Sequence, residues 1–206
     1  MKEETKRKIP NFLTVIRIIL IPVIICSFYM SSKITNIIVA SLFLGAGITD
    51  FFDGYLARAL KAQSNFGKCL DPIADKLLVA VSLIMLVNFS NQNLYILIPS
   101  MIIICREIMV SGLREFLATI HVGVPVTKLA KWKTAIQMVA ITSLLLAGNG
   151  SEYVYHEIMD IVEAEDFIRI NLEGIIQSMG EILLCISAAM TVITGYIYFK
   201  VGFKNF

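Results

Sequence analysis

The chain has 206 residues, of which 57% are hydrophobic and 17% charged, and its formal net charge is +2. Its mean hydropathy is +0.76, which is far too apolar for a soluble domain of this length. Composition therefore excludes an ordinary soluble protein and predicts an integral membrane protein.

Six apolar runs have about the length needed to cross a bilayer, whose apolar core is about 30 Å thick and takes roughly 20 helical residues. In chain order they lie at residues 12–31, 34–52, 72–90, 94–113, 134–149 and 174–199. The first run is of span length and no clear small-residue cleavage site follows it, so we expect it to be a retained helix. The sequence thus predicts an all-α polytopic membrane protein with six transmembrane helices, forming a single catalytic domain over residues 1–206.

Two segments lie outside these runs. Residues 1–11 mix basic, acidic and apolar side chains, and either a short amphipathic helix on the membrane surface or a solvated tail fits them. Residues 150–173 are acidic, and we expect a loop or a short amphipathic helix that runs over the surface.

The basic residues gather in alternate connections, which predicts the orientation because short cytoplasmic loops carry an excess of Lys and Arg. These connections and the two ends of the chain hold Lys2, Lys6, Arg7, Lys8, Arg58, Lys61, Lys68, Lys128, Lys131, Lys133, Lys200 and Lys204. The other connections hold Lys33, no charge at all, or the acidic segment. Both termini, with residues 1–11, are therefore predicted to be cytoplasmic, and residues 150–173 to be non-cytoplasmic.

Four aspartates stand at the end of the second run and around the start of the third. Asp50 and Asp53 are three residues apart, and Asp71 and Asp75 are four apart. If both segments are helical, each pair presents its oxygens on one helix face. Carboxylates near lipid are costly unless they are paired, hydrated or metal-bound. We therefore interpret the four aspartates as an oxygen cage and a candidate active site on the cytoplasmic side.

Carboxylate oxygens are the ligands that hard divalent cations prefer, and Mg²⁺ commonly binds through a few carboxylates and the phosphate oxygens of a substrate. This chemistry predicts a phosphate or diphosphate substrate. Gly54 and Gly67 leave room for close approach of a bulky ligand, and Arg58 supplies a planar cation for phosphate or for a carboxylate. The alternative for the glycines is close helix packing, a usual role of small residues in membranes.

These residues form the string DxxDGxxARx8GxxxDxxxD, complete from Asp50 to Asp75, which resembles the signature of the CDP-alcohol phosphotransferase family. The six-span layout resembles that family as well. Outside the signature, residues 9–17, 106–115 and 130–138 are similar to the bacterial phosphatidylglycerophosphate synthase branch. The resemblance implies transfer of a phosphatidyl group from CDP-diacylglycerol to glycerol 3-phosphate, with release of CMP.

The resemblance also implies roles for individual residues. Asp50, Asp53 and Asp71 would hold Mg²⁺ or Mn²⁺, with two ions, while Asp75 would accept the proton of the attacking hydroxyl and contact a metal. The nucleotide-binding residues would be Asp50, Gly54, Ala57, Arg58 and Gly67, with Asn11 and Thr14 as weaker candidates. A homodimer in a bacterial plasma (inner) membrane is implied too, in contact with membrane lipid and without a nucleic-acid partner.

Glycerol 3-phosphate carries a dianionic phosphate, so its site needs cations that an uncharged alcohol does not demand. Arg106 and Arg114 lie eight residues apart, within about a quarter turn around one helix, and both can face a common cavity. Lys131 and Lys133 can complete that site. The alternative is that these cations are anchors that reach lipid headgroups. The alternative is open for Lys133, whereas the depth of Arg106 in an apolar run favours binding.

Three neighbouring charges have less specific interpretations. Arg17 either pairs with a carboxylate or reaches the interface, and Lys76 is expected to be a structural pair partner. Glu107 can orient Arg106, although a salt bridge that only scaffolds the helices is the default interpretation.

Two alternative functions remain. A divalent-cation transporter also places carboxylates in a membrane, but it needs them along a path open to both sides. Within the resembled family, the acceptor could instead be serine, inositol phosphate or phosphatidylglycerol. The cations around Arg106 distinguish these acceptors.

Overall fold

In the computed structural model, the described backbone covers residues 3–30, 32–60, 65–90, 93–120, 128–148 and 164–203. Side chains are described for residues 15–30, 32–49, 70, 73–90, 93–120, 129–148, 172–200 and 202–203. Within these ranges the chain forms six helices: α1 (Glu3–Phe28), α2 (Lys33–Leu60), α3 (Asn65–Phe89), α4 (Leu94–Thr119), α5 (Lys128–Ala147) and α7 (Ala164–Phe203). The all-α prediction is confirmed, with one helix for each apolar run.

The helices are longer than the apolar runs that predicted them. Helix α1 begins at Glu3, so residues 3–11 continue the first apolar helix instead of forming a separate tail. Helix α7 begins at Ala164, so of the two expected forms, a loop or a short helix, residues 164–173 are helical, and they continue into the last apolar run. Residues 150–163 lie outside the described residues. Both extensions arise because polar residues can continue a helix once the apolar turns beside them have formed.

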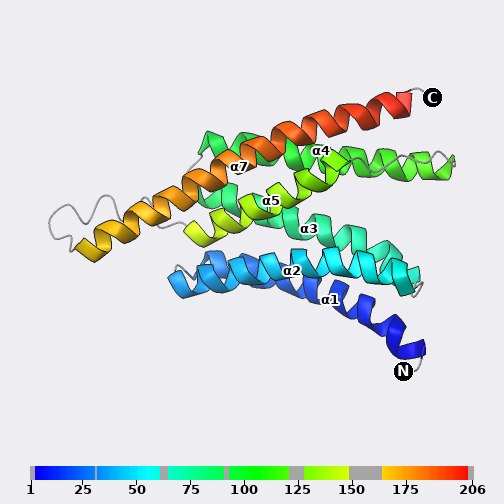
Figure 1. Ribbon diagram of the computed structural model, residues 1–206, viewed down its shortest axis with the longest axis horizontal. Coiled ribbons are helices and arrows are strands. Elements are labelled where there is room, and N and C mark those ends of the chain that lie inside the picture. Colours follow the sequence, from blue (N-terminus) through cyan, green and yellow to red (C-terminus); the bar gives the residue numbers. More distant parts are fainter. Residues whose placement is uncertain are drawn as a thin grey trace.

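The helices pack as two groups joined side by side (Figure 1). Helix α7 lies against α5 and α4, while α1 lies against α3 and α2. The groups meet where α2 contacts α5 and where α3 contacts α4. Each helix contributes a fully buried side chain to the shared core, namely Ile24, Phe43, Leu83, Ile103, Ile141 and Leu184.

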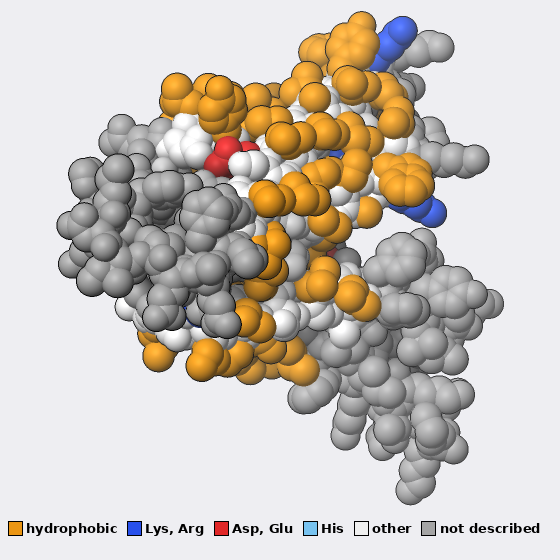
Figure 2. Space-filling view, turned by 60° about the vertical axis from the view of Figure 1, so that its left-hand side comes forward, with side chains coloured by type: hydrophobic (Ala, Val, Ile, Leu, Met, Phe, Trp, Pro, Cys, Tyr) orange, Lys and Arg blue, Asp and Glu red, His pale blue; other side chains and the backbone are white. Residues whose placement is uncertain are grey.

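The outer surface of the bundle is apolar, as a lipid environment requires. Large hydrophobic side chains such as Ile19, Ile84 and Met101 are exposed, and hydrophobic side chains cover most of the described surface in Figure 2. Among the described residues, two helical stretches are long and apolar enough to cross a membrane, namely Leu94–Thr119 and Leu172–Lys200. Two shorter apolar stretches, Val15–Phe28 and Lys33–Thr49, accompany them.

One end of the bundle gathers most of the segments that the sequence marks as functional. The start of α1, the end of α2, the start of α3, the end of α4 and the end of α7 all lie toward this end (Figure 1). We call it the aspartate end, because α2 reaches it after Asp50 and Asp53 and α3 leaves it before Asp71 and Asp75. The alternation of the helices thus brings the start of α1 and the end of α7 to the same end of the bundle as the aspartates.

At the opposite end, polar contacts join α7 to the start of α2 and to the residue that precedes α4. Lys33 pairs with Glu173 at 2.8 Å, and Asn93 donates a hydrogen bond to Glu181 at 2.9 Å. Helix α5 ends at Ala147 and is followed by Gly148, whose φ of 68° is the left-handed conformation common after a helix, and whose backbone N–H donates to Leu144 O. Glu173, the last residue of the predicted acidic segment, therefore has a structural partner on α2.

Helices α5 and α7 approach closely at Gly180, which predicts a measurable cost for a single methyl group. A Cβ at residue 180 would lie 2.8 Å from Leu144 Cγ, whereas one at Gly174 would meet nothing within 4 Å. Overpacking costs about 1–3 kcal/mol, and Gly to Ala in a helix returns about 1 kcal/mol. Gly180→Ala is expected to lower the unfolding temperature in detergent, and Gly174→Ala to keep or raise it. Equal shifts in the two variants would contradict the close packing.

Candidate active site

Both aspartate pairs lie on continuous helices, as their spacing requires. Asp50 and Asp53 belong to α2, and Asp71 and Asp75 belong to α3, so each pair is separated by about one helical turn. Of these four, only Asp75 has a described side chain. The other residues expected at the nucleotide and metal sites also lie outside the described side chains, namely Asn11, Thr14, Asp50, Asp53, Gly54, Ala57, Arg58, Gly67 and Asp71.

Asp75 is held by an ion pair that joins α3 to α1. Arg17 Nη1 donates to Asp75 Oδ1 at 2.6 Å, and the side chains are 4% and 36% exposed, respectively. The sequence left open whether Arg17 pairs with a carboxylate or reaches the interface, and the structure shows the carboxylate pair. A buried guanidinium needs such a partner, so the pair fixes the carboxylate of Asp75 relative to α1.

A second charged cluster lies between α4, α5 and α7. Arg106 Nη1 donates to Glu107 Oε1 at 3.2 Å, and its Nη2 donates to Thr194 Oγ1 at 2.8 Å. The guanidinium also lies over the ring of Tyr198, 5.7 Å from its centroid, in a cation–π contact. Lys133 Nζ donates to the same Glu107 oxygen. We call Arg106, Glu107, Lys133 and Thr194 the buried charge cluster.

The buried charge cluster contains two of the four predicted acceptor cations. The side chain of Lys133 is 5% exposed and that of Arg106 is 12% exposed, so neither is an anchor that reaches lipid headgroups. Arg114 and Lys131 are exposed, and no hydrogen bond or ion pair to either occurs among the described residues. The structure therefore brings Arg106 and Lys133 together through Glu107, and does not link the other two cations to them.

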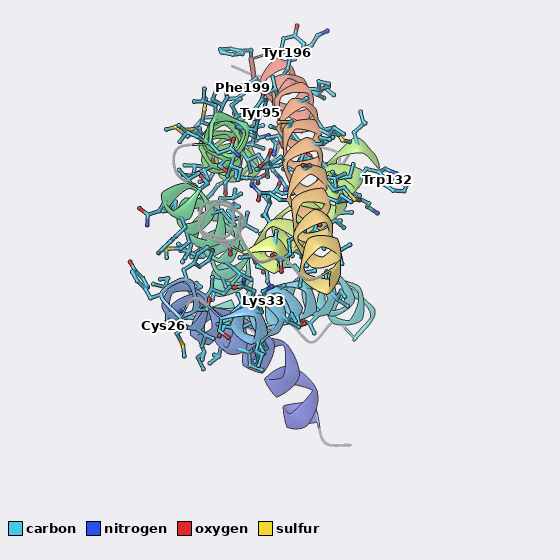
Figure 3. All side chains as sticks on the ribbon, turned by 90° about the vertical axis from the view of Figure 1, so that its left-hand side faces the viewer. Cys26, Lys33, Tyr95, Trp132, Tyr196 and Phe199 are labelled. Atoms are coloured by element: carbon cyan, nitrogen blue, oxygen red, sulfur yellow. The ribbon has the colours of Figure 1, made fainter. Side chains whose placement is uncertain are left out.

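Residues next to the buried charge cluster along the chain point to the outside of the bundle, because successive residues of a helix face different directions. Trp132, next to Lys133, points away from the bundle, and so does Tyr196, which lies between the buried Thr194 and Tyr198 (Figure 3).

Glu107 was predicted as a partner of Arg106, but not as a bridge to Lys133. Thr194 and Tyr198 were missed, because one Thr and one Tyr in an apolar run carry no distinguishing pattern.

Helix α3 approaches the helix of Arg106 next to the aspartates. Lys76, which follows Asp75, donates a hydrogen bond to Ser111 Oγ of α4. This contact agrees with the prediction that Lys76 is a structural pair partner. It also joins the helix of Asp75 to the helix that carries Arg106, about one and a half turns from Arg106 itself.

Comparison with known proteins adds to this geometry. The sequence model of the CDP-alcohol phosphatidyltransferase family matches residues 7–193, which is most of the chain. The chain belongs to the CDP-alcohol phosphatidyltransferase family. It is therefore an enzyme of a membrane-bound, metal-dependent family.

Several relatives are similar to this phosphatidyltransferase over nearly their whole length. A protein of Rickettsia bellii (strain RML369-C) is 48% identical over 96% of this chain and 97% of its own length. Proteins of Rickettsia felis and Cereibacter sphaeroides are 46% and 40% identical, over 97% and 93% of this chain and over 98% and 94% of their own lengths. All three are named CDP-diacylglycerol–glycerol-3-phosphate 3-phosphatidyltransferase.

The aspartates of this phosphatidyltransferase suit the divalent metal that its family uses. Among the side chains that the structure describes, no three His, Cys, Asp or Glu residues lie close enough to hold a metal ion, but three of the four aspartates are not among them. The four aspartates form two pairs, each about one turn apart, near the end of α2 and near the start of α3, and both of these helix ends lie at the aspartate end. Such an all-oxygen donor set fits a hard cation such as Mg²⁺.

Proposed function

We propose that this chain transfers the phosphatidyl group of CDP-diacylglycerol to glycerol 3-phosphate, giving phosphatidylglycerophosphate and CMP. The observation that carries this function is the similarity, over nearly the full length of both chains, to relatives that bear the name of this reaction. The pair of Arg106 and Lys133 supports an acceptor with a phosphate group, because these two largely enclosed cations share one carboxylate, Glu107, and together keep an excess of positive charge.

Asp75 is proposed as the general base. A hydroxyl oxygen of glycerol 3-phosphate attacks the phosphorus of the phosphatidyl group, its proton passes to the Asp75 carboxylate, and the bond to the CMP oxygen breaks. Arg17 orients that carboxylate through their ion pair. Asp50, Asp53 and Asp71, with Asp75, would hold Mg²⁺ or Mn²⁺, two ions in all, which neutralise charge on the diphosphate when bound.

The remaining substrate contacts are also proposals. Asp50, Gly54, Ala57, Arg58 and Gly67, with Asn11 and Thr14, would bind the cytidine diphosphate. Arg106 and Lys133 would bind the acceptor phosphate directly. Arg114 and Lys131 are exposed, which suits a role in attracting the dianion toward the site.

The membrane arrangement is proposed from the charge pattern and the helix order. All six helices would cross a bacterial plasma membrane as one domain over residues 1–206, with the aspartate end and both termini in the cytoplasm. This arrangement is supported by four helix termini that lie at the same end of the bundle: the start of α1, the end of α2, the start of α3 and the end of α7. A homodimer is proposed by analogy with the resembled family.

The function is tested by CMP release from the purified protein in detergent with CDP-diacylglycerol and Mg²⁺. Glycerol 3-phosphate, serine, inositol phosphate and phosphatidylglycerol are compared as acceptors. Release with glycerol 3-phosphate alone, lost when a chelator is added, is the expected result. Release with another acceptor would reassign the buried cations, and no release from folded protein would return a cation transporter to consideration.

Asp50→Asn is expected to weaken metal and nucleotide binding together, because one carboxylate would serve both. We expect at least a tenfold rise in the Mg²⁺ concentration that gives half-maximal CMP release, as for loss of a charged metal ligand. Binding of CDP-diacylglycerol should fall in parallel. An unchanged dependence on Mg²⁺ would count against Asp50 as a ligand.

A further inference from the structure

An acidic side chain stands between the two buried cations proposed to bind the acceptor phosphate. Glu107 Oε1 accepts from Arg106 of α4 and from Lys133 of α5. Among the described side chains, Glu107 is the acidic residue that forms ion pairs with both Arg106 and Lys133. The side chain of Glu107 is 27% exposed. Arg106 also donates a hydrogen bond to Thr194 of α7. The carboxylate of Glu107 on α4 therefore contacts a lysine that lies 26 positions away on α5.

A carboxylate in an anion site needs an explanation, since it repels the phosphate that the cations attract. The explanation lies in the state of the site before the acceptor binds. Two like charges buried side by side repel each other, and each alone would be costly to bury. With Glu107 ionised, the three charges sum to +1, and both cations have fixed positions.

We propose that Glu107 is a positioning residue for the acceptor: it holds the side chains of Arg106 and Lys133 in place for the phosphate of glycerol 3-phosphate. The inference rests on the proposed function of these cations. Preorganised donors bind an anion more tightly than mobile ones, because less freedom is lost on binding. With two cations and one carboxylate, the site keeps a net positive charge and still attracts a dianion.

The test is Glu107→Gln in the full-length protein, measured by CMP release. Glutamine keeps the size and hydrogen bonding of the side chain and removes its charge. The KM for glycerol 3-phosphate is expected to rise about tenfold, which corresponds to about 1.4 kcal/mol, while the KM for CDP-diacylglycerol stays unchanged. The matched control is Glu115→Gln, the same change at an exposed residue of the same helix, which should leave both values unchanged.

A double variant separates positioning from a merely structural role. If Glu107 acts through Lys133, Glu107→Gln should add little to the acceptor KM of Lys133→Gln. If Glu107 only fastens α4 to α5, its variant will unfold at a lower temperature with an unchanged acceptor KM, which would overturn the proposal. An acceptor KM that falls would overturn it as well. Failure of the proposed function itself would appear separately, as wild-type protein that does not use glycerol 3-phosphate.

Discussion

Replacing Asp75 with asparagine is expected to abolish CMP release while leaving CDP-diacylglycerol binding largely intact. Asparagine keeps the shape of the side chain but cannot accept the proton of the attacking hydroxyl. A positioned general base contributes about 10²- to 10⁴-fold to a rate, so turnover should fall by at least that factor. The measurement is CMP release beside equilibrium binding of the lipid nucleotide.

The ion pair of Asp75 requires a control for folding. Asp75→Asn removes the negative charge that Arg17 contacts at 2.6 Å, and because Asp75 is 36% exposed the cost should stay below the about 3–5 kcal/mol of breaking a fully buried pair. The double variant Asp75→Asn/Arg17→Gln removes both charges, and should recover the unfolding temperature without recovering activity. Turnover like that of the wild type in either folded variant would exclude Asp75 as the base.

Replacing Arg106 with alanine is expected to weaken use of glycerol 3-phosphate far more than use of CDP-diacylglycerol. The guanidinium donates to Glu107 and Thr194 and lies over the ring of Tyr198, so its position is fixed by residues of two helices. Removing one partner of a buried charged contact costs about 2–5 kcal/mol. We therefore expect the KM for glycerol 3-phosphate to rise on the order of 100-fold.

Arg114→Ala is the matched comparison for Arg106→Ala. It makes the same change on the same helix, at an exposed side chain. Its effect on the acceptor KM should be smaller and should shrink further with added salt, because exposed charges are screened. Equal losses for the two substrates in Arg106→Ala would undermine the role of Arg106 in acceptor binding.

The candidate site was predictable where its functional side chains lie close together along the chain. Asp50 and Asp53, and Asp71 and Asp75, needed only helical segments to come within one turn, and α2 and α3 supply these helices. The membrane class followed from composition, and the helix count followed from the apolar runs. Helix ends were less predictable, since α7 begins at Ala164, well before its apolar run.

The acceptor cations show where prediction from spacing stops. Lys131 and Lys133 are two residues apart, yet one is exposed and the other buried, because two residues turn a helix by about 200°. Arg106 and Arg114 differ by about 80° around α4 and about 12 Å along it. Arg114 is accordingly exposed, whereas Arg106 contacts Thr194 and Tyr198 of α7.

The sequence by itself determined the membrane class, the helical fold, the family and the aspartate pairs, because each depends on composition, on a motif along the chain or on neighbours within one helical turn. Only the tertiary structure decided the pairs that hold the charged side chains. Arg17 meets Asp75 across 58 positions, Lys133 meets Glu107 across 26, and Arg106 meets Thr194 across 88. The physical reason is that a buried charge takes whichever partner the packing of separate helices brings within reach, and the spacing along one helix does not encode that packing.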